Sequence, residues 1–187
     1  MSEQVKDFDM PDVYKRIDAL VDPGSFLEYN RFLEVNNAAF DFPSVNAKGE
    51  GVQTGFAQID GRKIFLVAQD AAVLGGSVGQ GQAGKICDGM ARAASAGCPV
   101  VFLWDSLGAR LQEGAAAVAA YAQITRALAA TSGVVPTVSV VLGTQIGSAA
   151  ILSQLCDFTI LVRGQSVQSL VSPGVMAAVQ GADLDDE

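Results

Sequence analysis

Two stretches of small and polar residues in this sequence have the composition and position needed to hold an anionic oxygen. They are residues 105–114 and residues 143–149. Each follows a hydrophobic run typical of a buried strand and precedes a run typical of a helix. At such a junction the first backbone N–H groups of the helix have no partner within it. Two facing junctions predict an oxyanion hole, in which backbone amides stabilise negative charge on one oxygen.

The sequence contains no histidine and only three cysteines. The missing imidazole excludes the Ser-His-Asp and Cys-His arrangements of nucleophilic catalysis and leaves no zinc site. Cys87, Cys98 and Cys156 lack metal-binding spacing and lie in apolar stretches, so we expect small buried residues in a reducing compartment and no bound metal. Any catalysis must therefore use backbone dipoles, carboxylates, a cofactor or a partner subunit.

A third glycine-rich segment, residues 75–79, precedes a predicted helix. It lacks the complete dinucleotide-binding pattern and the lysine of a phosphate loop. Its glycines have two explanations, a crowded or positive-φ backbone and contact with a ligand, and the sequence does not choose between them. Two charged residues nearby are also open: Arg110 could hold a phosphate or pair with a carboxylate, and Glu113 fits a first-turn acid at a helix start.

The composition is that of a globular domain, because 50% of the 187 residues are hydrophobic and 17% are charged. A net charge of −8 disfavours binding to nucleic acid or to an anionic membrane. The sequence has no signal-peptide pattern, and its longest apolar run, residues 134–143, is too short to span a bilayer. We expect a cytoplasmic protein. A ligand with phosphates would need local cations, and the middle of the chain offers Lys63, Lys85, Arg92 and Arg110.

Alternating strands and helices must position the small-residue blocks. Helical periodicity predicts two peripheral helices within residues 10–37, the second over residues 25–35. Asp60 and Gly61 join two strand-like runs into a predicted hairpin. Buried strands then alternate with helices, which predicts an α/β fold with a partly parallel sheet. The predicted strands are 52–59, 63–68, 99–104, 136–142 and 158–162, and the later helices are 80–96, 112–131 and 147–155.

Several blocks, in the same order, resemble the carboxyltransferase subunits of biotin-dependent acyl-CoA carboxylases and decarboxylases, which belong to the crotonase superfamily. The resemblance implies a crotonase-like spiral of ββα units over residues 46–187, with peripheral helices and a linker in residues 1–45. It matches the N-terminal domain of that family, so a complete site would need a partner. The matching blocks are 51–61, 69–70, 75–77, 85–86, 105–106, 108–114, 132–136 and 157–158.

The resemblance also implies roles for individual residues. The backbone amides of Gly147 and Ser148, together with that of Ala109, would hold the thioester carbonyl of an acyl-CoA as its enolate forms. The family implies a C-terminal-domain-type carboxyltransferase subunit and a biotin carrier as partners, in a homo- or hetero-oligomer. The residues expected to contact the acyl-CoA are Gly75, Gly76, Ser77, Gly108 and Arg110.

The sequence departs from the family pattern beside the proposed amides. Leu107 stands where the first block usually has a glycine, and Ile146 and Ser148 replace smaller residues or proline in the second. Ala150 or Ile151 stands where hydratases of the superfamily carry a glutamate, which disfavours hydration and isomerisation.

Two functions therefore remain from the sequence: a carboxyltransferase or decarboxylase subunit that acts with a partner, and a non-catalytic scaffold with a degenerate site. A third, a stand-alone crotonase-type hydrolase, needs a positioned acid or base, for which Glu113 and Asp105 are poor candidates. Family members carry a second homologous domain, so the chain is either a natural split subunit or a fragment.

Overall fold

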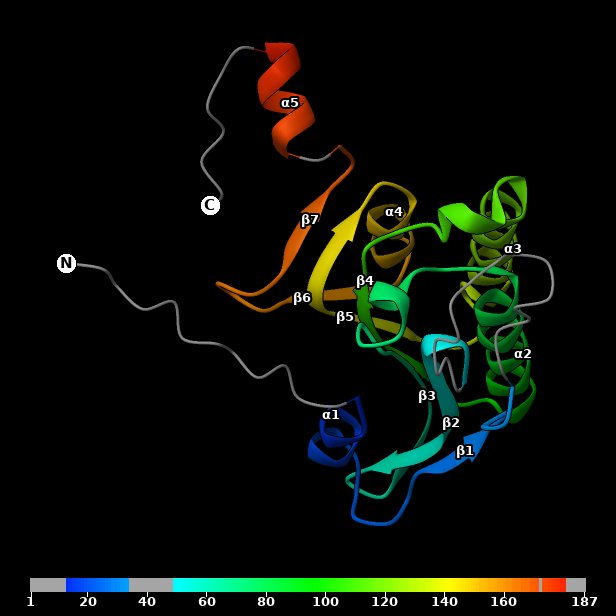
Figure 1. The fold of residues 1–187 in the computed structure, drawn as a ribbon. Coiled ribbons are helices and arrows are strands. Elements are labelled where there is room, and N and C mark those ends of the chain that lie inside the picture. The colour runs from blue at the N-terminus through cyan, green and yellow to red at the C-terminus, as the bar shows by residue number, and fades with distance from the viewer. Residues whose placement is uncertain (1–12, 34–48, 172, 181–187) are drawn as a thin grey trace.

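The computed structural model of this chain describes residues 13–33, 49–171 and 173–180 (Figure 1). Its strands are β1 (Leu27–Tyr29), β2 (Val52–Ile59), β3 (Arg62–Gln69), β4 (Val100–Ser106), β5 (Thr137–Ile146), β6 (Phe158–Leu161) and β7 (Val167–Ser169). Its helices are α1 (Val13–Leu20), α2 (Gln80–Ala96), α3 (Ala115–Thr131), α4 (Ser148–Gln154) and α5 (Pro173–Gln180). Three short 3-10 turns are η2 (Gly49–Gly51), η3 (Leu74–Gly76) and η4 (Leu111–Glu113).

All the strands belong to one mixed sheet. The strand order is β1-β2-β3-β4-β5-β6, and β7 pairs with β5 off this path. Strand β2 is antiparallel to both of its neighbours, β1 and β3, whereas β3 to β6 run parallel. Parallel neighbours need crossover connections, and α2, α3 and α4 supply them. The predicted α/β class with a partly parallel sheet is confirmed.

The hairpin predicted around Asp60 and Gly61 is present between β2 and β3. Both turn residues have positive φ, 49° and 73°, as a two-residue hairpin loop of this kind requires. The carboxylate of Asp22 accepts hydrogen bonds from the amides of Asp60 (2.9 Å) and Gly61 (2.8 Å). The residues just after α1 therefore fasten the turn.

The helix predicted over residues 25–35 is wrong for the described part of that segment. Residues Leu27–Tyr29 instead form β1, which pairs antiparallel with β2. Gly55 permits this approach, because a Cβ atom there would lie 2.3 Å from the main-chain oxygen of Leu27. The Tyr29 ring meets Phe56 edge-on, with ring centroids 5.8 Å apart. The partner of β1 lies far away in sequence, so local periodicity could not reveal it.

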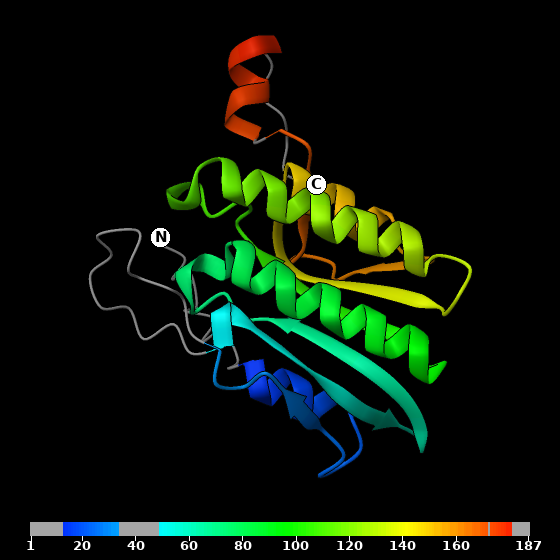
Figure 2. The same ribbon diagram turned by 90° about the vertical axis from the view of Figure 1, so that its right-hand side faces the viewer.

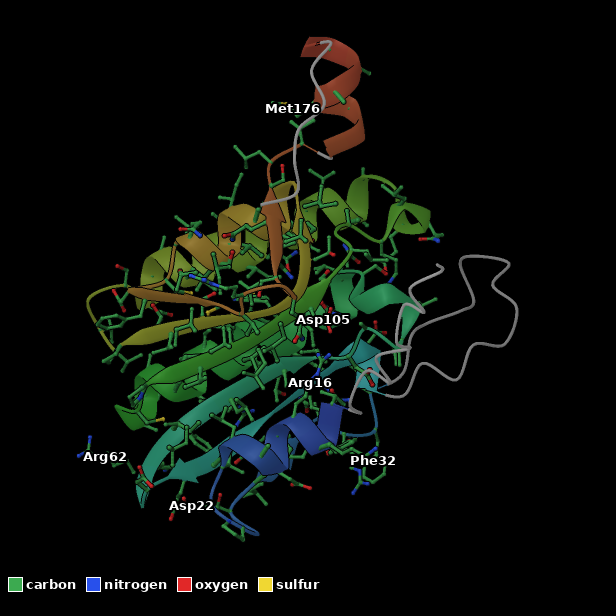
Figure 3. All side chains as sticks on the ribbon, turned by 90° about the vertical axis from the view of Figure 1, so that its left-hand side faces the viewer. Arg16, Asp22, Phe32, Arg62, Asp105 and Met176 are labelled. Carbon is green, nitrogen blue, oxygen red and sulfur yellow. The ribbon has the colours of Figure 1, made fainter. Side chains whose placement is uncertain are left out.

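Helices cover the two faces of the sheet unequally. On one face α2 and α3 lie side by side in parallel, as Figure 2 shows, and with α4 they bury the larger core. On the other face α1 packs across β2 to β4 and buries Val13, Ile17 and Val21 (Figure 3). Beyond α1, the same face carries Phe158 and Ile160 on β6, which are 64% and 52% exposed. That half of the sheet is apolar, and no helix of the described ranges buries it.

The second half of the chain differs from the prediction in the length of one strand. The strand predicted to end at residue 142 continues to Ile146, because β7 adds a second neighbour along residues 144–146 of β5. The following helix starts at Ser148, close to the predicted residue 147. Helix α5 projects away from the rest of the fold (Figure 1). Within the part of the chain that the structure describes, no helix is long and apolar enough to cross a membrane. The division into residues 1–45 and 46–187 stays a prediction.

Candidate active site

The glycine-rich segments 75–79 and 105–114 form one hydrogen-bonded unit at the carboxyl end of β4. The amide of Leu107 donates to the main-chain oxygen of Gly75 (3.0 Å), and the amide of Val78 donates to that of Gly108 (2.8 Å). The Arg110 amide returns a third bond to Val78, at 2.9 Å. The carboxyl ends of parallel strands are where α/β folds usually place ligands. The structure therefore joins segments that are thirty residues apart in sequence at a suitable edge of the sheet.

The two blocks predicted to face each other also lie side by side. Ser106 at the end of β4 is paired with Gln145 on β5. The Gln145 side chain accepts from the Ser106 amide and donates to the main-chain oxygen of Ala149, both at 3.1 Å. A Cβ atom on Gly108 would lie 3.7 Å from the main-chain oxygen of Ile146. The buried amide of Gln145 thus joins the loop after β4 to the start of α4.

The three predicted oxyanion amides have different surroundings. The Gly147 amide donates to the main-chain oxygen of Ser169 on β7, at 3.0 Å. The amides of Ala109 and Ser148 donate to no main-chain or side-chain acceptor in the described ranges. Ser148 is the first residue of α4 and is exposed. Two of the three predicted donors therefore have no hydrogen-bond acceptor among the described residues, and the catalytic role of all three stays a prediction.

The glycines of the segment 75–79 have a structural explanation. Gly75 and Gly76 both adopt a φ of 64°. A Cβ atom on Gly76 would lie 2.1 Å from the main-chain oxygen of Asp105, and one on Gly75 would lie 2.7 Å from Leu107 Cδ1. Crowding and positive φ are sufficient reasons for glycine at both positions. Contact of Gly75, Gly76, Ser77 or Gly108 with an acyl-CoA stays a prediction.

Leu107, one of the departures from the family pattern, lies over this turn. Its side chain is 68% exposed. It therefore covers the backbone of Gly75 while leaving most of its own surface to solvent at the edge of the site.

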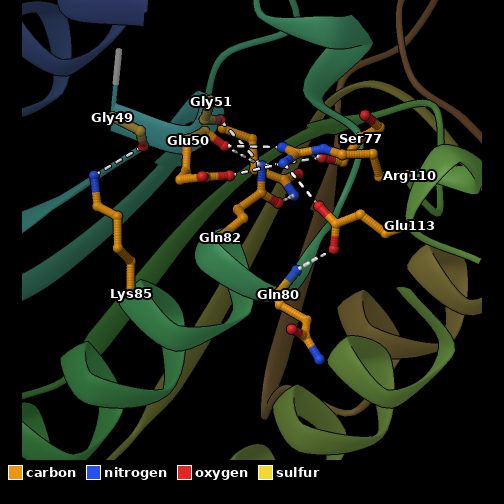
Figure 4. Close-up of polar contacts among 10 residues, drawn as sticks. Gly49, Glu50, Gly51, Ser77, Gln80, Gln82, Lys85, Arg110 and Glu113 are labelled. Carbon is orange, nitrogen blue, oxygen red and sulfur yellow. Dashed lines mark hydrogen bonds and ion pairs between the residues drawn. The ribbon is translucent and has the colours of Figure 1, made fainter. Parts of the chain in front are cut away.

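The charged residue Arg110 is in an ion pair. Its side chain is 1% exposed, and its Nη1 lies 2.7 Å from Glu50 Oε2 and 3.1 Å from Glu113 Oε1 (Figure 4). Its Nη2 donates to the main-chain oxygens of Ser77 (3.1 Å) and Glu50 (3.4 Å). Of the two sequence alternatives, pairing with a carboxylate is the one observed. A direct contact of Arg110 with an acyl-CoA stays a prediction.

Two glycines at the start of α2, Gly79 and Gly81, have a role that no local sequence pattern indicates. A Cβ atom on Gly79 would lie 2.0 Å from Glu113 Oε1, and one on Gly81 would lie 2.6 Å from Glu50 Cδ. These glycines make room for the two carboxylates that flank Arg110. Glu113 also accepts a hydrogen bond from the Gln80 amide at 2.8 Å, so it caps the first turn of α2 rather than of its own helix. No local sequence pattern links these residues.

Lys85 is a buried cation that fastens the turn η2. It is 2% exposed, and its Nζ donates to the main-chain oxygens of Gly49 (2.9 Å) and Val52 (2.5 Å). Burial lowers the pKa of Lys85 from 10.5 to about 8, because desolvation disfavours the charged form, and nearby Glu28 and Glu50 partly oppose this. The Lys85 ammonium group therefore binds main-chain oxygens of the protein itself.

The two other cations considered from the sequence also contact protein groups. Arg92 Nε lies 2.8 Å from Asp88 Oδ2 on the surface of α2. Lys63 Nζ lies 4.4 Å from the centre of the Phe56 ring. The part of the chain that the structure describes therefore shows no cluster of these cations at the loops, and a phosphate-binding role for them is not supported.

A polar chain connects the site to the opposite face of the sheet. Arg16 on α1 lies 2.6 Å from Asp105 Oδ2, and both side chains are largely buried (Figure 3). The Asp105 amide donates to Gln69 Oε1 at 3.0 Å, and Gln69 Nε2 donates to Gln82 Oε1 at 3.1 Å. Gln82 Nε2 in turn donates to the main-chain oxygen of Glu50 at 3.1 Å. Backbone positions on both sides of the loops are therefore held by buried amide side chains.

The cysteines lie away from these loops, and so does a groove between α2 and α3. A groove of about 370 Å³ runs between α2 and α3, and its lining includes four alanines, Met90, Cys87 and Arg126. Cys98 is buried, whereas Cys87 and Cys156 are half-buried. Burial raises the pKa of Cys87, and that of Cys156 to about 12, which keeps these thiols protonated and unreactive. Within the described residues, no group of acidic or cysteine side chains is arranged to hold a metal ion.

The sequence of this chain is similar to proteins of known function. The family profile of the carboxyl transferase domain matches residues 12–187. The chain is 39% identical over 170 residues to the carboxyltransferase subunit of propionyl-CoA carboxylase from Haloferax mediterranei, with 91% of this chain and 33% of that protein covered. It is also 39% identical over 175 residues to the human mitochondrial propionyl-CoA carboxylase beta chain, with 92% of this chain and 32% of that protein covered.

Solved structures give the same result for the fold. Transcarboxylase 12S, in a structure with methylmalonyl-coenzyme A and methylmalonic acid bound, superposes with a TM-score of 0.88 at 32% identity, over 94% of this chain and 34% of the other. The hetero-dimer MdcD–MdcE of Pseudomonas malonate decarboxylase gives a TM-score of 0.73 at 26% identity, over 91% of this chain and 70% of the matched chain. The predicted crotonase-like fold is therefore confirmed.

The chain spans about a third of the length of the curated relatives that it matches. The match to the family profile nevertheless runs from residue 12 to the last residue and includes every loop described above. The chain therefore belongs to the carboxyl transferase domain family.

Proposed function

We propose that this chain is a subunit of a carboxyltransferase or decarboxylase that acts on an acyl-CoA or acyl-carrier thioester. It corresponds to the N-terminal domain of the family's longer members. The observation that carries the proposal is a pair of amides, Ala109 and Ser148, on adjacent loops at the carboxyl ends of β4 and β5, for which the described residues provide no acceptor. Amides preorganised in this way stabilise the negative charge that develops on a thioester carbonyl oxygen. The chemistry needs no histidine, in agreement with the sequence.

In this mechanism the two amides bind the thioester oxygen and hold it while charge moves onto it. The enolate forms when the α-carboxyl group is lost as CO2, which leaves the electron pair of the broken C–C bond on the substrate, or when a base removes an α-proton before carboxylation. The donors fit this task because backbone N–H groups can only donate, and an enolate oxygen can only accept. A biotin group on a partner's carrier would accept or supply the carboxyl carbon.

The relatives support the substrate class and the need for a partner. Proteins named as propionyl-CoA carboxylase subunits are three times as long as the matched segment. The malonate decarboxylase relative is a hetero-dimer. We therefore propose that a C-terminal-domain-type carboxyltransferase subunit completes the site of this chain.

The proposal is tested by removing one amide without removing its helix. Proline is tolerated at the first residue of a helix, where its missing N–H has no helical partner. Ser148→Pro should therefore fold normally but bind propionyl-CoA about tenfold more weakly relative to CoA, which has no thioester carbonyl. Ser148→Ala retains the amide and is the matched control. Calorimetric titration of both ligands measures the ratio.

Wild-type protein with no preference for propionyl-CoA over CoA would contradict the proposal. The competing function, a non-catalytic scaffold, is favoured by one observation: the Gly147 amide, a predicted donor, is already bonded to Ser169. A scaffold should bind neither ligand in a saturable way. Turnover of malonyl- or methylmalonyl-type thioesters by the chain with its partner would exclude it.

A further inference from the structure

Glu50 occupies a strained and enclosed position beside the candidate site. Its φ is 60°, and Gly49 and Gly51 on either side have φ values of 71° and 70°. Residues other than glycine rarely adopt this left-handed conformation, and where it occurs, the surrounding structure must hold it. The Glu50 residue is only 3% exposed. A strained, buried acid next to an active-site loop calls for a functional explanation.

The Glu50 carboxylate forms a buried ion pair with Arg110. The distance from Oε2 to Arg110 Nη1 is 2.7 Å, and the side chains are 5% and 1% exposed (Figure 4). Buried ion pairs lose hydration and add little net stability, but their directional hydrogen bonds fix geometry. Gly81 provides the space for the carboxylate at the start of α2. The arrangement is suited to positioning Arg110 more than to stabilising the fold.

Arg110 directly follows Ala109, whose amide is a proposed oxyanion donor. The Arg110 amide is bound to Val78, and on the other side of Ala109 the Gly108 amide donates to Ser106 Oγ at 3.2 Å. The Arg110 side chain therefore fixes the carboxyl-terminal side of Ala109, while Ser106 fixes the amino-terminal side. The Ala109 N–H shares its peptide plane with the Gly108 carbonyl, which accepts from the Val78 amide at 2.8 Å. The Val78 amide shares its own plane with the Ser77 carbonyl, which accepts from Arg110 Nη2 at 3.1 Å. A shift of the Arg110 side chain would therefore reach the Ala109 N–H through these two peptide planes.

We propose that Glu50 is a positioning residue that acts through Arg110 to aim the Ala109 amide at the thioester oxygen. This inference rests on the proposed function. Glu50 does not touch the substrate, so its loss should weaken only the contact with the thioester carbonyl. The nucleotide part of CoA should bind as before.

Glu50→Gln tests this inference, because it keeps the shape of the side chain and removes its charge. We expect the ratio of the Kd for CoA to the Kd for propionyl-CoA to fall about tenfold, with the Kd for CoA nearly unchanged. Asp88→Asn is the matched control. It removes the exposed ion pair between Asp88 and Arg92 within α2, and it should leave both Kd values unchanged. A purely structural role would weaken both ligands equally.

The outcomes separate this inference from the proposed function. If wild-type protein shows no preference for propionyl-CoA, the proposed function fails, and the inference fails with it. If wild-type protein shows the preference and Glu50→Gln retains it, only the inference fails. If Glu50→Gln does not fold, Arg110→Lys keeps the charge but loses the bonds from Nη2, and it should show the same fall in the ratio.

Should both variants be unfolded, amide hydrogen exchange on the wild-type chain decides. A loop held by this ion pair should protect the Arg110 and Val78 amides as well as the amides of β4. Glu113→Gln weakens the contacts of this carboxylate with Arg110 and with the Gln80 amide, and it should speed the exchange of the Arg110 and Val78 amides relative to the amides of β4. Exchange that is fast in the wild-type chain, or unaffected by Glu113→Gln, would overturn the inference.

Discussion

The carboxylate of Asp105 fills the space that a side chain at Gly143 would need: a Cβ atom there would lie 2.1 Å from Asp105 Oδ1. The other oxygen of the same carboxylate lies 2.6 Å from Arg16 Nη1 on α1. A glycine on β5 therefore allows β4 to direct a charged side chain at the helix on that face. The close contact explains a glycine that the sequence suggested only as part of a small-residue block.

Gly143→Ala should displace the Asp105 carboxylate and lengthen its contact with Arg16. We expect a loss of about 1–3 kcal/mol in the free energy of unfolding, which is typical of overpacking a close contact. Chemical denaturation measures the change. Gly84→Ala is the control, since no atom within 4 Å would meet its Cβ and its φ is ordinary. An unchanged stability in Gly143→Ala would contradict the contact.

Two glycines of helix α2 should respond to alanine in opposite directions. Gly84→Ala should stabilise the protein by about 0.5–1 kcal/mol, the usual advantage of alanine in a helix. Gly81→Ala should destabilise it, because its Cβ would lie 2.6 Å from Glu50 Cδ. Thermal unfolding of both variants gives the comparison. Equal stabilisation by both substitutions would show that the Glu50 carboxylate is not held at that place.

The burial of Lys85 should make stability depend on pH. Its folded pKa of about 8 lies below the ordinary 10.5, so between these values the unfolded chain binds more protons than the folded one. Stability should rise with pH across this window, by at most about 1.4 kcal/mol per pH unit. Lys85→Met lacks this contribution. Urea unfolding of both proteins between pH 7.5 and 9.5 should show a growing advantage of the wild type, and parallel curves would contradict the prediction.

Asp157 should also make stability rise with pH, but in the acid range rather than the alkaline one. Hydrogen bonds from the Thr137 amide (2.7 Å) and hydroxyl (2.9 Å) lower the pKa of Asp157 below its ordinary 3.8. Its contribution is therefore complete above pH 3.8 and is lost as the pH falls through the folded value. Asp157→Asn should lower Tm at neutral pH, and the difference should shrink in acid. A difference that stays constant below pH 3.8 would refute this role.

Local sequence patterns predicted the elements whose determinants are local. Helix α2 has the predicted bounds of residues 80 and 96, because Gly79 precedes it and Gly97, with a φ of 63°, ends it in the left-handed conformation. The hairpin turn at Asp60 and Gly61 likewise depends on two adjacent residues. The resemblance of several blocks, in the same order along the chain, predicted the family and the fold. This prediction was possible because the blocks extend over most of the sequence.

The elements and contacts that depend on distant partners could not be predicted in this way. Strand β1 forms because β2 offers it a free edge, and β5 is longer than predicted because β7 pairs with its end. The availability of the proposed amides has the same origin. Gly147 and Ser148 are neighbours in sequence, yet only the first has its N–H bonded to β7.

The sequence by itself determined that two small-residue segments lie between a strand and a helix, that a third precedes a helix, and that this chain supplies no histidine. Only the tertiary structure decided what the glycines accommodate and where the charges go. Gly79 and Gly81 make room for Glu113 and Glu50, and these acids hold Arg110 inside the protein. The physical reason is that a glycine in the sequence shows only that a side chain is missing at that position. The group that fills the space comes from a distant part of the chain, and only the folded structure brings the two together.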